Sequence, residues 1–580
     1  MKVTLALVAS LLSTVLAAPA PVASHEGLQE RATTITATIP AGQVIGIVTS
    51  QKTENFAGIP YAYAPTGSRR LKPPVRYTDT LVNFDATQAA PACPQMAANA
   101  ASNDFLSSVL TTLINTPLVA DDVLKISEDC LTIDVSRPAG TKAGDNLPVL
   151  FWIFGGGFEL GWSAMYDGAS LVSNAVTNGK PFVFVAVNYR VGGFGFMPGK
   201  EILADGSANL GHLDQRMGLQ WVADNIAAFG GDPTKVTIWG ESAGAISVYN
   251  QMSMYDGDNT YNGKALFRGA IMNSGSVIPA DPVDCPKGQA VYDAVVAAAG
   301  CSGSSDTLNC LRALPYDTFL KAANSQPAIL SYNSVALTYI PRPDGTALTQ
   351  SAELLLAQKK YAAVPMIIGD QEDEGTLFSL FQSNTTSTTA KLVDYLSKIF
   401  FHDATTAQIT SLVNTYPSSL LDGSPFNTGL FNEIYPGFKR LAAILGDATF
   451  TITRRIFLEG ATTLNPSVPA WSYLASYDYG TPILGTFHGS DILQVFFGIL
   501  PNYASKGIQS YYVNFVYNLN PNDYSGGTGT GTKVKETWPQ WDATNKKLIR
   551  FYASYFTFIT DTFRQASEAV LKANIGSFRI

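Results

Sequence analysis

A serine between small residues is the first candidate for chemistry in this sequence. Ser242 occupies the centre of a Gly-x-Ser-x-Gly segment, 240–244, which follows the β-branched run 236–239 and precedes a segment with a helical pattern. A strand that turns sharply into a helix holds such a serine in a strained conformation, and the glycines let strand and helix approach each other. The context therefore predicts an exposed nucleophile rather than an ordinary glycine-rich turn.

A serine hydroxyl needs a base to remove its proton, and a histidine oriented by a carboxylate commonly does this. The chain has four histidines, of which His25 and His212 precede Ser242. A nucleophile on a strand–turn–helix elbow is followed along the chain by the acid and then by the histidine. His402 adjoins the aromatic run KIFFHD, whereas His488 lies in the glycine-flanked loop GTFHGSD. The loop favours His488 as the base, and we expect His402 to be structural or exposed.

The acid should lie where a strand ends. The segment VPMIIGDQEDEG places Asp370, Glu372, Asp373 and Glu374 directly after the strand-like run 364–368. Most carboxylates in such a cluster are solvated loop charges, and the residue pattern alone does not choose among these four.

Three glycines follow the strand-like run VLFWIF, 149–154, and precede Phe158. Backbone N–H groups at Gly156 and Gly157, together with that of Ala243, could point at an oxygen that becomes negative during acyl transfer. Each such donor contributes about 3 kcal/mol to the stability of a transition state. The alternative is a flexible turn, but a position directly after a buried strand favours an oxyanion hole.

The elements around these motifs predict a largely parallel sheet covered by helices. Buried parallel strands appear as short apolar runs that alternate with helical segments such as 215–229. We find no internal repeat, and we expect the low-complexity stretch 525–532 to be a surface loop of one large domain. The strand-like runs are 149–154, 182–187, 236–239, 364–368 and 471–474.

Composition describes a well-buried globular chain of 580 residues with 46% hydrophobic and 14% charged residues. A net charge of −8 without a basic block argues against a nucleic-acid partner. A signal peptide is predicted at 1–18, because Lys2 precedes an apolar run at 3–16 and small residues follow it. We expect a candidate pro-segment at 19–31 and a domain at 32–580 after it. The run is too short for a membrane anchor, which needs about 20 apolar residues. We therefore expect an extracellular protein without a transmembrane anchor.

Secretion makes the five cysteines candidates for disulfides, and Cys285 is our candidate for a buried free thiol. Between Cys93 and Cys130 lies an uncharged segment with apolar residues at helical spacing, within 104–122. Such a helix fits the core of a domain and a mobile lid over an active site equally well.

Several long motifs together resemble the fungal type-B carboxylesterase/lipase family, and most closely its sterol esterase and versatile lipase branch. The resemblance covers nearly the whole mature chain. Its most specific motifs are FGGDPTKVTIWGESAG, SEDCLTIDV, FWIFGGGFELG, NLGHLDQRMGLQWVADNIA, IIGDQEDEG and GTFHGSD.

The resemblance implies an α/β-hydrolase fold with a large, mostly parallel central sheet, flanking helices and a lid in a disulfide loop, at about 94–129. It also implies that no metal or organic cofactor is needed. Cys285 departs from the two-bridge pattern of the family. Carried over position by position, the family's residues are the nucleophile Ser242, the acid Glu374, the base His488, the oxyanion donors Gly156, Gly157 and Ala243, and the disulfides Cys93–Cys130 and Cys301–Cys310.

These inferences together predict a serine ester hydrolase that cleaves sterol esters and long-chain acylglycerols at an oil or micelle interface. The alternatives are a general short-chain carboxylesterase and a non-catalytic binding or adhesion protein on the same fold. We expect a glycan at Asn384, in the sequon Asn384-Thr385-Thr386, and a monomer or a reversible homodimer. The residues expected to contact the acyl chain are Phe158, Leu377, Phe378 and the run 492–500, although core packing would explain Leu377, Phe378 and the run equally well.

Overall fold

The computed structural model describes residues 33–96, 125–166, 168–383, 386–477, 481–496, 502–523 and 536–580. The expected signal peptide and pro-segment, residues 97–124 of the expected lid, the sequon residue Asn384 and the stretch 525–532 lie outside these residues.

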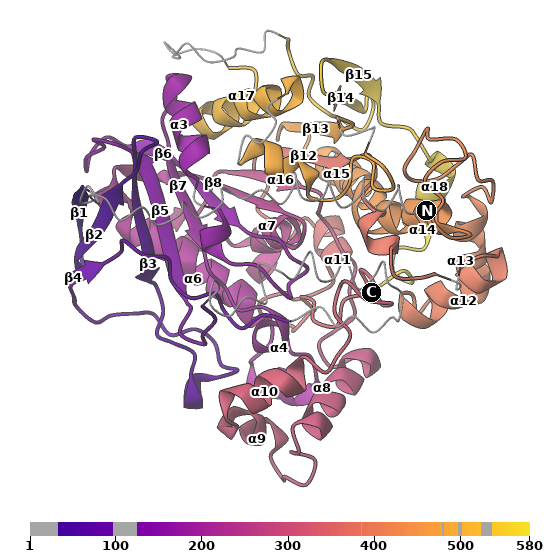
Figure 1. The fold of residues 1–580 in the computed structure, drawn as a ribbon, viewed down its shortest axis with the longest axis horizontal. Coiled ribbons are helices and arrows are strands. Elements are labelled where there is room, and N and C mark those ends of the chain that lie inside the picture. Colours follow the sequence, from indigo (N-terminus) through magenta and orange to yellow (C-terminus); the bar gives the residue numbers. More distant parts are fainter. Residues whose placement is uncertain are drawn as a thin grey trace, which may run out of the picture.

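A 13-stranded sheet runs through the molecule (Figure 1). Its central strands are all parallel, in the order β7-β6-β8-β11-β12-β13-β14. Parallel strands covered on both faces are apolar throughout, and every residue of β7, β11, β12 and β13 is buried. The bounds are β6 Leu147–Ile153, β7 Val183–Val187, β8 Gly231–Glu241, β11 Gly269–Asn273, β12 Met366–Gln371, β13 Ala470–Ala475 and β14 Lys547–Phe551.

Antiparallel strands extend the sheet at both edges, so the sheet is mixed rather than wholly parallel. At one edge β5 pairs with β7 and leads to β3, β2 and β1, and at the other β15 pairs with β14. The short β4 pairs with β2 beside this path. Their bounds are β1 Thr34–Ile39, β2 Gly42–Val48, β3 Thr53–Pro60, β4 Leu81–Asp85, β5 Thr132–Pro138 and β15 Phe556–Thr560, and a separate ribbon joins β9 Thr260–Tyr261 to β10 Lys264–Ala265.

The strand and helix predictions around the motifs are confirmed with small shifts in their ends. Each of the five strand-like runs falls on one of the central strands β6, β7, β8, β12 and β13. The expected helix at 215–229 is α6 Leu210–Asn225, which begins five residues earlier and ends in a 3₁₀ turn, Ile226–Phe229.

Helices cover both faces of the central strands (Figure 1). On one face of β6, a β carbon added at Gly218 of α6 would meet the ring of Phe151. The next residue of β6, Trp152, contacts Trp239, which in turn packs against Tyr512 of α17. Because successive side chains of a strand point to opposite faces, α6 and α17 cover opposite sides of the sheet. Helix α7 contacts α6, and α3 is joined to α17 by a hydrogen bond between Asn174 and Gln509.

The other helices surround the central strands, and α12 to α18 follow β12 in the chain. None of the described helices is both long and apolar enough to cross a membrane. The bounds are α3 Ala169–Thr177, α4 Gly192–Gly195, α5 Lys200–Asp205, α7 Ala243–Ser253, α8 Pro286–Ala298, α9 Thr307–Ala313, α10 Tyr316–Ala323, α11 Ala352–Ala357, α12 Thr389–Ile399, α13 Thr406–Asn414, α14 Phe438–Gly446, α15 Ile452–Leu464, α16 Ser490–Val495, α17 Tyr503–Asn518 and α18 Gln565–Ala573.

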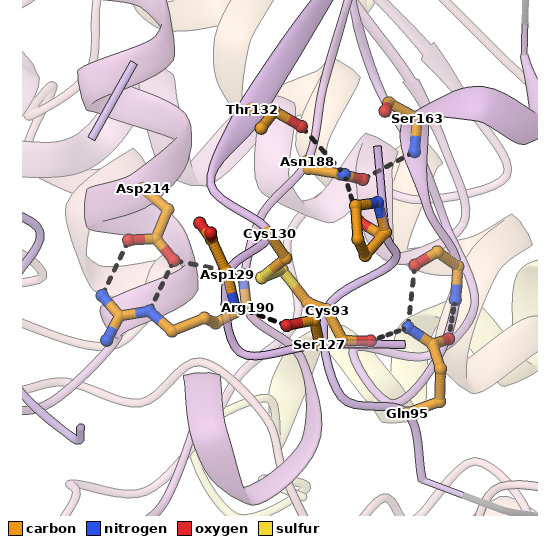
Figure 2. Close-up of a disulfide and its surroundings, with 12 residues drawn as sticks. Cys93, Gln95, Ser127, Asp129, Cys130, Thr132, Ser163, Asn188, Arg190 and Asp214 are labelled. Carbon is orange, nitrogen blue, oxygen red and sulfur yellow. Dashed lines mark hydrogen bonds and ion pairs between the residues drawn. A yellow bond between two sulfur atoms is a disulfide. The ribbon is translucent and has the colours of Figure 1, made fainter. Parts of the chain in front are cut away.

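Both disulfides implied by the family resemblance are present. Cys93 is bonded to Cys130, as Figure 2 shows, and Cys301 to Cys310. Cys285 is a free thiol and is partly rather than fully buried, because it caps the N-terminus of α8, where its sulfur accepts the N–H of Gly288.

Candidate active site

Ser242 lies on a sharp turn between β8 and α7. Its φ of 57° and ψ of −125° are unusual for a residue with a side chain, and its N–H donates to the carbonyl of Asn273. A β carbon at Gly240 would lie 2.3 Å from the backbone of Gly244, and one at Gly244 would lie 2.0 Å from the carbonyl oxygen of Ile153. The turn therefore requires glycine at both positions.

His488 and Glu374 meet beside this turn although they are 114 residues apart in the chain. His488 Nδ1 lies 2.5 Å from Glu374 Oε2, and Glu374 Oε1 accepts the N–H of Gln371 at 2.7 Å. Glu374 follows β12, and the loop that carries His488 is bonded to the same turn through Thr486 and Asp373. Because β6, β8 and β12 run parallel, the residues that follow them lie at one edge of the sheet.

The other three carboxylates of the acidic cluster have partners elsewhere. Asp370 binds the guanidinium of Arg454 at 2.5 Å, and Glu372 binds Arg550 at 2.6 Å. Asp373 accepts the hydroxyl of Ser424 and backbone N–H groups of the two loops packed beside it. Within the described residues, Glu374 is thus the member of this cluster that contacts a histidine.

The remaining described histidines have other partners. His402 is exposed beside a different pocket, which it lines with the charged residues Lys287 and Asp403. His212 is buried, where its ring bonds to Gln215 and Asn250.

The second ring nitrogen of His488 carries no hydrogen bond within the described part of the chain. This Nε2 is buried and lies 3.3 Å from Glu241 Oε1. Burial alone would lower the pKa of His488, but the carboxylates of Glu374 and Glu241 outweigh it and raise that pKa, so they favour the imidazolium form. Burial raises the pKa of Glu241 to about 8. Glu241 was not among the expected site residues, and its place next to the serine is the one signal in the sequence that marks it.

The triple-glycine turn packs against the serine. A β carbon at Gly155 would lie 3.0 Å from that of Ser242, and Gly156 and Gly157 have left-handed φ values of 92° and 66°. Gly157 and Ala243 line the same pocket as Ser242, whereas Gly156 is not among its lining residues. Ala243 is the first residue of α7, so its N–H has no acceptor within the helix and can bind a ligand.

An apolar pocket opens at Ser242. Phe158 and Phe378 line it, whereas Leu377 is not among its lining residues. Phe496, from the run 492–500, instead packs in the core against Trp152 and Trp239, and residues 497–500 lie outside the described part. Most of the apolar lining comes from positions that no motif marks, including Ile246, Ile278, Ile329, Leu337, Leu348 and Leu355.

These parts comprise a serine hydroxyl on a sharp turn, an imidazole held by a carboxylate, backbone N–H groups and an apolar cavity. Such a set can perform acyl transfer through a covalent acyl-serine. The described residues contain no group of three or more histidines, cysteines and acids that could hold a metal ion.

Comparisons with known proteins agree with this chemistry. A secreted lipase 1 of Botryotinia fuckeliana is 59% identical over 584 residues and covers 100% of both chains. A secreted triacylglycerol lipase LIP1 of Gibberella zeae is 58% identical, over 96% of this chain and 93% of its own. Lipase 5 of Diutina rugosa is 44% identical over 99% of each chain.

Two solved structures share the fold. The crystal structure of Aspergillus niger EstA matches with a TM-score of 0.77 and 24% identity, over 94% of this chain and 99% of that chain. A PNB esterase matches with a TM-score of 0.71 and 26% identity, over 92% and 100%. The expected α/β-hydrolase fold is confirmed. The model of the carboxylesterase family matches residues 33–564, so the chain belongs to the carboxylesterase family and is a carboxylic ester hydrolase, as its motifs predicted.

Proposed function

We propose that this chain is a secreted lipase that hydrolyses long-chain esters, sterol esters and acylglycerols among them, through an acyl-enzyme on Ser242. The observation that carries the proposal is the apolar pocket that adjoins the serine, because an acyl chain needs an extended apolar cavity beside the nucleophile. Relatives named secreted lipase and secreted triacylglycerol lipase support both the substrate class and secretion.

In the proposed mechanism, Ser242 Oγ attacks the ester carbonyl while His488 Nε2 accepts its proton. Glu374 holds the Nδ1 proton and stabilises the imidazolium that forms. His488 then gives the proton to the leaving alcohol. Water attacks the acyl-serine with the same histidine as base, and the fatty acid is released.

The backbone N–H groups of Gly156, Gly157 and Ala243 receive the negative oxygen of both tetrahedral intermediates. The unusual conformations of Ser242, Gly156 and Gly157 support this assignment, since they place backbone rather than side chains at the reacting carbonyl. Phe158 and Phe378 contact the acyl chain.

The expected lid belongs to the same proposal. A helix within 94–129, held by the Cys93–Cys130 bridge, would cover the pocket in water and turn its apolar face to a lipid surface. We also propose the signal peptide at 1–18, one catalytic domain from residue 32, and a glycan at Asn384.

A substrate panel tests the proposal. We expect the purified enzyme to hydrolyse triolein and cholesteryl oleate emulsions, and Ser242→Ala to lose this activity together with fluorophosphonate labelling. Hydrolysis of p-nitrophenyl butyrate without either emulsion would replace the proposal by a short-chain carboxylesterase. A chain that is neither labelled nor active would instead be a binding protein.

A further inference from the structure

The first residues of the Cys93–Cys130 loop are hydrogen-bonded to the turn that carries Gly156 and Gly157. Gln95 Oε1 accepts the N–H of Gly161 at 2.6 Å, and Gln95 Nε2 donates to the carbonyl of Gly161 at 3.2 Å. The same Nε2 donates to the carbonyl of Cys93 at 2.6 Å, so the amide is buried with its hydrogen-bonding groups used (Figure 2).

A second contact lies beside the first. The N–H of Met96 donates to the carbonyl of Glu159 at 2.8 Å, and the N–H groups of Glu159 and Leu160 both donate to the carbonyl of Gly156 at 3.1 Å. The carbonyl of Gly156 is thus held by two N–H groups of its own turn. Residues Glu159 and Gly161, at the far end of the turn, are held by Met96 and Gln95 of the disulfide loop.

Other contacts hold the middle of the turn, where the carbonyl of Phe158 accepts the N–H of Gly192 and Glu159 Oε2 accepts the N–H of Ile329. Gln95 holds the far end, at the N–H and carbonyl of Gly161. Gly156, Gly157 and Gly161 have no side chains, and a β carbon at Gly161 would lie 2.6 Å from the Phe154 ring. Glycine has the widest choice of backbone conformation, so a turn built on it relies on hydrogen bonds for a single geometry. An oxyanion donor also loses most of its effect when it is misplaced by about 1 Å.

We propose that Gln95 is a positioning residue that fixes the backbone donors of residues 156–157 and links the disulfide loop mechanically to them. The inference rests on the proposed function, because it assigns Gln95 to the oxyanion hole of that reaction. Gln95 does not touch the substrate. It acts through Gly161 and the turn.

Two variants test this link. Gln95→Met keeps the length of the side chain and loses every hydrogen bond, whereas Gln95→Glu keeps the acceptor for Gly161 N–H and loses both donated bonds. The exposed Gln358, which bonds to Gln350, gives the matched control Gln358→Met. We measure kcat and KM with p-nitrophenyl butyrate, affinity for a trifluoromethyl ketone that forms an oxyanion on the serine, and thermal unfolding.

We expect Gln95→Met to lower kcat at least 10-fold with KM changed less than 2-fold. The ketone affinity should fall in parallel, and Gln95→Glu should lie between Gln95→Met and wild type. A purely structural role would lower the unfolding temperature without a matched loss of kcat and ketone affinity, and that result would overturn the inference. If Gln95→Met does not fold, Gln95→Glu alone decides by the same criteria. Failure of the proposed function would appear separately, as wild type without activity or labelling.

Discussion

Replacement of Glu374 by glutamine tests the proposed base sharply, because the structure dictates how the new amide must lie. Glu374 Oε1 accepts the N–H of Gln371 at 2.7 Å, while Oε2 faces His488 Nδ1 at 2.5 Å. Only the amide oxygen of a glutamine can accept the N–H of Gln371. Its NH₂ group must then face Nδ1, which becomes an acceptor, and the imidazole proton moves to Nε2.

A histidine protonated on Nε2 cannot take the serine proton, so Glu374→Gln should disable the base while the fold is kept. The reverse amide orientation would oppose two N–H donors, which costs about 1–3 kcal/mol or roughly 10- to 100-fold. Loss of the carboxylate charge beside the imidazolium adds to this. The corresponding aspartate-to-asparagine change in a serine protease triad lowers kcat about 10⁴-fold. We therefore expect kcat to fall about 10³- to 10⁴-fold, equivalent to about 4–5.5 kcal/mol.

The assay is steady-state hydrolysis of p-nitrophenyl butyrate at neutral pH, a soluble substrate that avoids effects of lipid adsorption. Glu372→Gln is the matched control, because Glu372 lies in the same turn and bonds to Arg550 instead of a histidine. Retention of more than a tenth of wild-type kcat by Glu374→Gln would refute the reasoning. An equal loss in Glu372→Gln would also refute it.

The structure leads to three further predictions. His488→Ala should lose activity by orders of magnitude whereas His402→Ala keeps it, and an equal loss in both would show that the base is misassigned. Ser242→Gly should unfold at a higher temperature than Ser242→Ala, because glycine relieves a φ of 57° that costs about 1–2 kcal/mol; calorimetry that finds the reverse order would contradict this strain. Burial raises the pKa of Glu159 to about 8, above the unfolded-state value of 4.5. The folded protein therefore holds this proton more tightly than the unfolded chain, and the free energy of unfolding falls as the pH rises from 4.5 towards 8. Glu159→Gln should flatten this part of the curve of unfolding free energy against pH, and curves that stay parallel would exclude Glu159 as the cause.

Features that depend on neighbours along the chain can be read from the amino-acid order alone. The strand, the serine and the glycines of the elbow lie within a few residues of each other, and the conformation they adopt follows from local sterics. The five apolar runs became strands for the same reason, since each run is short, β-branched and bounded by turn residues. Chain order and loop context were also enough to favour His488 over His402.

Tertiary structure alone decided which groups meet. The residue pattern left four acids open, the family resemblance favoured Glu374, and the contact with His488 depends on two loops docked together at the ends of parallel strands. The apolar pocket is likewise assembled from loops and helices distant in sequence, so Leu377 is not among its lining residues and positions that no motif marks line it instead. A short segment fixes its own backbone, but the distance between two side chains far apart in the chain depends on the register and packing of every element between them.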